Sequence, residues 1–134
     1  MWELEGKQVS VTVKDAKEVT EVIVKELQPF SVLVFGSVAK NGSGEDLDLL
    51  IVMDEEKITG SDANVLVHTC LKDFYKKFSI DPFVLTKSDF AQFNGKGSPF
   101  LRMSLKEGRR LYMKDEDYHI KVAISDEDIV FIDS

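Results

Sequence analysis

The sequence has few of the residues that are typical of disulfide-rich, zinc-binding or membrane proteins. It has one cysteine, Cys70, and two histidines among 134 residues, so it can form no internal disulfide and offers no cluster of zinc ligands. No apolar run approaches the roughly 18 residues needed to cross a bilayer. The segment from Met1 to Glu5 lacks the basic and apolar regions of a signal peptide. We therefore expect a cytoplasmic protein with no membrane contact.

Basic residues are also in the minority. Lys and Arg together number 17 against 24 Asp and Glu, which gives a net charge of −7. The average field of such a chain repels nucleic acid, although a local basic group can still hold a small phosphorylated ligand. Hydrophobic residues make up 43% of the sequence, enough for a buried core. The length predicts a single domain over residues 1–134.

Apolar periodicity predicts an α/β (α+β) fold, in which a mixed β-sheet has helices packed on one face. The predicted strands are 9–13, which could pair with 2–5, then 30–35, 47–52, 79–85 and 111–113, and in the tail 120–124 and 129–132. The predicted helices are 15–27, 61–78 and a stretch before Gly108. Asp15 and Glu18 would form the capping box of the first helix, and Pro29 would end it. Pro82 confines its strand to an edge or an irregular position, and Cys70 is expected to be a buried structural thiol.

The residues that can carry chemistry lie around the buried strands. Gly36 and Ser37 follow the first of these, and a Gly-Ser turn exposes backbone N–H groups and a hydroxyl to which a phosphate can come close. Asp46 and Asp48 open the next strand on one face, where they can ligate hard divalent cations that bridge to phosphates. Asp81, on a later strand, would complete a set of carboxylates for two Mg²⁺ ions. Like charges leading into an apolar strand cost free energy unless a cation offsets them, so the pattern predicts in-line transfer at phosphorus.

The segment FGSVAKNGSGEDLDLLIV resembles the signature of the DNA polymerase beta-like nucleotidyltransferase superfamily. That signature is an apolar residue, Gly, then Gly or Ser, a spacer, and two acidic residues separated by an apolar one. The resemblance is to the small prokaryotic branch, the minimal nucleotidyltransferases. It implies metal-dependent transfer of a nucleoside monophosphate from ATP, or another nucleoside triphosphate, to a hydroxyl acceptor with release of pyrophosphate.

The resemblance is strongest over residues 15–113, and it leaves 1–13 and 119–134 as accessory strands. It implies that Gly36 and Ser37 hold the β- and γ-phosphates of the nucleotide. Lys40 stands where many members have Arg, and it would neutralise charge on the triphosphate as a point charge.

The resemblance also implies how the carboxylates act. Asp46 and Asp48 would coordinate two Mg²⁺ ions, or Mn²⁺ in their place, while Asp81 would bind the catalytic ion and assist deprotonation of the incoming hydroxyl. A protein partner of HEPN toxin type is implied, with this chain acting as the antitoxin that modifies a tyrosine of the toxin; a second copy of the chain could also complete the acceptor site. The alternative is a catalytically silent binding module that keeps the fold and neutralises its partner by contact.

Overall fold

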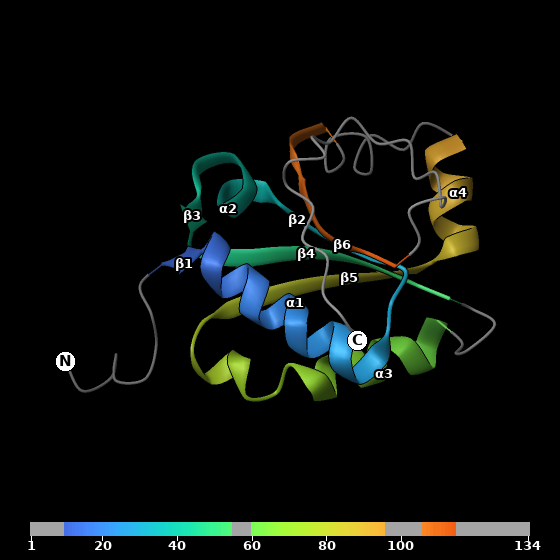
Figure 1. The fold of residues 1–134 in the computed structure, drawn as a ribbon, viewed down its shortest axis with the longest axis horizontal. Helices are drawn as coiled ribbons and strands as arrows, with labels where there is room; N and C mark the ends of the chain where they lie inside the picture. Colours follow the sequence, from blue (N-terminus) through green and yellow to red (C-terminus); the bar gives the residue numbers. More distant parts are fainter. Residues whose placement is uncertain (1–9, 55–59, 96–105, 115–134) are drawn as a thin grey trace.

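The computed structural model describes residues 10–54, 60–95 and 106–114. Its elements, in chain order, are β1 (Val11–Thr12), α1 (Val13–Leu27), β2 (Ser31–Phe35), α2 (Gly36–Asn41), β3 (Ser43–Gly44), β4 (Asp46–Met53), α3 (Gly60–Cys70), the 3₁₀ helix η2 (Phe74–Lys76), β5 (Ser79–Thr86), α4 (Lys87–Gly95) and β6 (Arg109–Met113). One sheet has the strand order β5-β4-β2-β6, and β1 pairs with β3 apart from it (Figure 1). Strand β2 runs antiparallel to β4 and β6, whereas β4 and β5 are parallel. The predicted mixed sheet of an α/β protein is confirmed.

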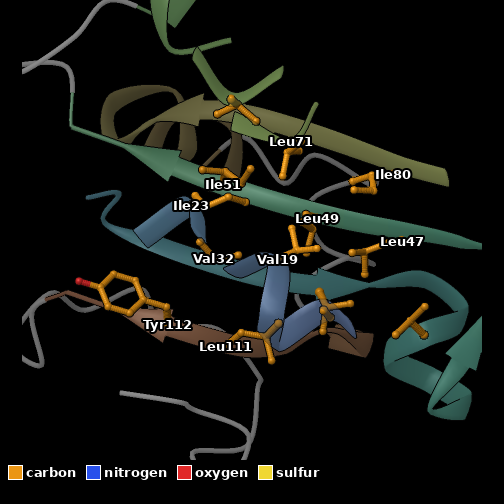
Figure 2. Close-up of a cluster of buried hydrophobic side chains, with 14 of the residues drawn as sticks. Val19, Ile23, Val32, Leu47, Leu49, Ile51, Leu71, Ile80, Leu111 and Tyr112 are labelled. Atoms are coloured by element: carbon orange, nitrogen blue, oxygen red, sulfur yellow. The ribbon is translucent and has the colours of Figure 1, made fainter. Parts of the chain in front are cut away.

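Helices α1 and α3 lie together on one face of the sheet (Figure 1). Val19 and Ile23 of α1 pack there with Leu49 and Ile51 of β4, and Leu71, just after α3, joins the same cluster (Figure 2). All five side chains are fully buried, and burial of an aliphatic side chain contributes about 1.5–3 kcal/mol. This cluster is the main core, and it confirms that predicted helices pack on this face of the sheet.

A smaller apolar cluster occupies the opposite face. Leu33 and Phe35 of β2 meet Leu50 and Val52 of β4 there, and Phe90 of α4 packs onto them. Helix α4 was not predicted, and it follows directly from the end of β5. Because successive side chains of a strand point to opposite faces, the acidic residues at the start of β4 share this second face.

The first helix begins earlier than predicted. Val13 starts α1 instead of ending a strand, and β1 pairs with β3, which was not predicted. The predicted partner, residues 2–5, lies outside the described residues, as does Val9. The capping box is formed by Thr12 and Asp15, so its prediction at Asp15 and Glu18 is wrong. The Thr12 N–H donates to Oδ2 of Asp15 over 2.9 Å, and the Asp15 N–H donates to the Thr12 hydroxyl over 3.3 Å. With both donors satisfied, the helix starts two residues sooner, at Val13.

The predicted helix 61–78 is interrupted. Helix α3 ends at Cys70, after which the Lys72 N–H bonds the carbonyl of Thr69, three residues back, and a turn leads into η2. Leu71 and Phe78 are both buried, one just after the end of α3 and the other after η2. Cys70 lies at the margin of the core with intermediate exposure, so its prediction as a buried thiol is wrong.

Other predicted elements are placed as expected. In the part of the chain that the structure describes, β5 pairs with β4 alone, which puts Pro82 on an edge strand as predicted. Residues 111–113 lie within β6. Most of the stretch before Gly108, and the tail strands 120–124 and 129–132, lie outside the described residues. No described helix combines the length and the apolar character needed to span a membrane.

Candidate functional site

Three adjacent strands bring most of the predicted site residues together. In the parallel register of β4 and β5, Asp48 lies directly beside Asp81. On the other side of β4, Asp48 lies beside Phe35, the last residue of β2, and Gly36 follows at once. Asp46 is two residues from Asp48 on the same strand and therefore on the same face. The carboxylates of β4 and β5 thus meet the start of α2 at one edge of the sheet.

Gly36 is the residue that lets Asp48 come close to the end of β2. Its φ of +71° is in the left-handed region, which favours glycine. A Cβ built on Gly36 would also overlap Oδ2 of Asp48. The Asp48 carboxylate therefore lies against the backbone where α2 begins. The tight turn predicted after β2 is wrong, because Gly36 and Ser37 form the first turn of a short helix.

Helix α2 and strand β3 form most of the spacer between Ser37 and Asp46. Ser37 and Lys40 are both exposed and stand three residues apart, so they are neighbours on the surface of α2. Strand β3 passes close behind Ser37, since a Cβ on Gly44 would come within 2.8 Å of the Ser37 Cβ. The side chains of Ser37, in the first turn of α2, and of Lys40, in its last turn, are both exposed.

The electrostatics of the site centre on Asp48. Burial, followed by the negative charges of Asp81 and Asp46, raises the pKa of Asp48 from 3.8 to about 6. Asp48 is half-buried, whereas Asp46 and Asp81 are exposed. The folded chain holds these like charges close together, and a bound cation would relieve the repulsion.

The carboxylates fit Mg²⁺ as part of a shared coordination sphere. Among residues 10–54, 60–95 and 106–114, no three Asp, Glu, His or Cys side chains converge into a preformed metal cluster. Mg²⁺ commonly takes one or two carboxylates and completes its octahedron with water and substrate phosphates. Asp46 and Asp48 supply carboxylate oxygens of this kind, and their mutual repulsion favours a cation. The start of α2 beside them is accessible to a phosphate. The donor set fits an ion held jointly by Asp46, Asp48 and a phosphate ligand, with Asp81 nearby.

No motif of the sequence marks the aromatic residues around these carboxylates. Burial, and then the charge of Asp81, raises the pKa of Tyr75, and Nδ1 of His68 lies 2.7 Å from the Tyr75 hydroxyl. Phe83 shares its strand and face with Asp81, and its ring centroid lies 5.5 Å from that of Phe35. Strand alternation, counted two residues on from Asp81, could have found Phe83. No sequence signal places Tyr75 near Asp81, because the break in the helix positions it.

The mixed sheet, with a Gly-Ser helix start facing paired carboxylates, defines a nucleotidyltransferase-like fold. The sequence matches the family described as Polymerase beta, Nucleotidyltransferase over residues 17–117, which is most of the chain. The chain belongs to this polymerase beta-like nucleotidyltransferase family, as the resemblance of its motif predicted. A comparison with the curated proteins finds no match.

Proposed function

We propose that this protein is a Mg²⁺-dependent nucleotidyltransferase that moves a nucleoside monophosphate from ATP to a hydroxyl acceptor and releases pyrophosphate. The observation that carries the proposal is the position of Asp48. Its carboxylate lies against Gly36 on one side and beside Asp81 on the other. Groups suited to phosphate and groups suited to a cation are therefore close enough to act on one nucleotide.

The β- and γ-phosphates would lie at the start of α2. Gly36 has no side chain to keep them from the backbone, and the exposed hydroxyl of Ser37 can donate a hydrogen bond. Lys40, exposed nearby on α2, would neutralise part of the phosphate charge. A cation is needed in this position because the chain has a net charge of −7 and the adjoining carboxylates repel a polyanion.

The carboxylates would have different roles. Asp46 and Asp48 would hold Mg²⁺, with Asp81 sharing one ion. When bound, the metal supplies positive charge to the phosphates and to the attacking and leaving oxygens. Asp81 is exposed on the edge strand, so an acceptor hydroxyl can reach it and pass it a proton. The acceptor oxygen bonds to the α-phosphorus as the bond from that phosphorus to pyrophosphate breaks.

The acceptor that we propose is a tyrosine of a HEPN-type toxin, with this chain as the cytoplasmic antitoxin. The resemblance to minimal nucleotidyltransferases suggests this partner. An additional support is the place of Asp81 on β5, whose only described partner strand is β4. Such an acceptor, whether that partner or a second copy of this chain, would approach from the side of β5 on which no described strand pairs with it.

Nucleotide binding provides the first test. Calorimetry should show ATP binding that requires Mg²⁺ or Mn²⁺, because the carboxylates would otherwise repel the phosphates. Asp46→Asn should abolish this metal-dependent binding, whereas Asp73→Asn, a change at an exposed acidic residue outside the site, should preserve it. Equal affinity for ATP in excess chelator would contradict the proposal.

Transfer provides the second test. Asp81→Asn should remove most transfer while ATP binding, which depends on Ser37, Asp46 and Asp48, survives at reduced strength. Mass spectrometry of the co-expressed toxin should show an added nucleoside monophosphate with the wild type and none with Asp81→Asn, although both proteins still co-purify with it. If the wild type also leaves the toxin unmodified in the presence of Mg²⁺ and ATP, the silent binding module is the better description.

A further inference from the structure

Phe83 is an exposed aromatic residue on the face of the sheet that carries the carboxylates. It lies two residues after Asp81 on β5, so the two side chains project from the same face with their Cα atoms about 7 Å apart. Its side chain is 40% exposed. Its ring packs against that of Phe35, with an interplanar angle of 51°. The contact with Phe35 fixes the ring and leaves part of its surface open to solvent.

The position of Phe83 distinguishes it from the other large hydrophobic residues that are exposed in the described part of the chain. Val65 and Leu66, which are 65% and 42% exposed, both lie on α3. Helix α3 covers the opposite face of the sheet (Figure 1). Phe83 alone of these three adjoins the carboxylates, and Leu66 provides a matched control of similar exposure.

The chemistry of the transfer defines the side from which an acceptor would arrive. In the proposed function, pyrophosphate leaves from the end of β2, where Gly36 and Ser37 lie. Attack in line requires the acceptor oxygen on the side of the α-phosphorus opposite to the leaving oxygen. Across the sheet the strands run β2, β4, β5. The acceptor would therefore approach over β5, the strand of Asp81 and Phe83.

We infer that Phe83 is the residue that selects the acceptor, by packing against an aromatic ring whose hydroxyl reaches Asp81. This inference rests on the proposed function. A phenol suits both neighbours, because its ring can meet the exposed part of Phe83 edge to face. Its hydroxyl, with an ordinary pKa of about 10, also loses its proton more readily than an aliphatic alcohol. The nucleotide is held from β2 and β4, so the ring on β5 serves the acceptor.

A titration followed by nuclear magnetic resonance tests this role on the full chain. The protein is loaded with Mg²⁺ and the non-transferable analogue α,β-methylene-ATP, and N-acetyl-tyrosinamide is the acceptor probe, with N-acetyl-serinamide for comparison. The tyrosine probe should shift the amide signals of Phe83 and Phe35, and the serine probe should not. Phe83→Leu should weaken binding of the tyrosine probe about three- to ten-fold. Phe83→Tyr, which keeps the ring, and the control Leu66→Ala should bind it as the wild type does.

The same titration separates failure of the inference from failure of the proposed function. If the analogue does not bind with Mg²⁺, the proposed function fails. If the analogue binds but the tyrosine probe does not, or binds Phe83→Leu as tightly as the wild type, the role of Phe83 is overturned. A loss of affinity for the analogue in Phe83→Leu, with probe binding unchanged, would also overturn it, because the ring would then serve the nucleotide.

Discussion

Replacing Asp48 with Asn should stabilise the metal-free protein above the pH at which Asp48 ionises. In the folded chain its pKa is about 6, against an ordinary value of 3.8, because of burial and of the charges on Asp81 and Asp46. A carboxyl with a raised pKa keeps its proton to higher pH in the folded state than in the unfolded state. The contribution of Asp48 to stability therefore falls as the pH rises from 3.8 to about 6, and it stays unfavourable above that range.

The magnitude follows from the two pKa values of Asp48. Their difference corresponds to about 3 kcal/mol as an upper value. Asp48 is only half-buried, so screening by water reduces this, and we expect a gain of about 1–2 kcal/mol from Asp48→Asn. Asn has nearly the same shape as Asp and fits the space that Gly36 leaves. In a domain of this size the gain corresponds to a rise in Tm of about 3–8 °C.

Urea unfolding in excess chelator, at about pH 4 and about pH 8, measures this effect. The Asp48→Asn variant should exceed the wild type in free energy of unfolding at the higher pH, and by only a small fraction of that gain at the lower. The control Asp73→Asn should show no such pH-dependent gain. A variant no more stable than the wild type at about pH 8, or stabilised equally at both pH values, would refute the reasoning.

Two further predictions concern the backbone around the site and the start of the first helix. Gly36→Ala should destabilise the protein by about 2–4 kcal/mol, because it combines a left-handed φ with a clash against Asp48. Gly42→Ala should cost only about 1 kcal/mol, because its φ of +84° disfavours a side chain but no atom lies in the way of the added Cβ. Chemical denaturation of both variants compares the two losses in free energy of unfolding, and equal losses would contradict the clash. Thr12→Ala should cost about 1 kcal/mol by removing the acceptor for the Asp15 N–H, and an unchanged Tm would show that the capping box contributes nothing.

The parts of the fold that could be predicted are those in which residue type and spacing act locally. The run from Ser31 to Phe35 is apolar and β-branched, too short for a helix, and it forms a buried strand. Asp46 and Asp48 share a face because strand side chains alternate, and Pro82 indicates an edge strand because it cannot donate to a ladder. The location of the candidate carboxylates followed from these local rules and from the motif.

The parts that could not be predicted depend on contacts between segments. Gly36 and Ser37 suggest a turn, and only the packing of β3 against α2 reveals a helix there. The break after Cys70 accompanies the packing of η2 against β5, whereas Leu71 and Phe78 keep the spacing of a single helix face and so give no sign of it. The packing of Phe83 against Phe35 joins two strands that are separated by β4, so neither strand alone indicates it.

The register of β4 links the stability of the fold to the integrity of the site. Leu47 and Leu49 point into the core under α1 and α3, while Asp46 and Asp48 alternate with them on the other face. A slip of one residue would exchange the two sets and bury a carboxylate among aliphatic side chains, at a cost of several kcal/mol. The same slip would move Asp48 away from both Asp81 and Gly36. The pattern that fills the core thus also keeps the carboxylates at the start of α2, and the geometry of the site is set by strand register.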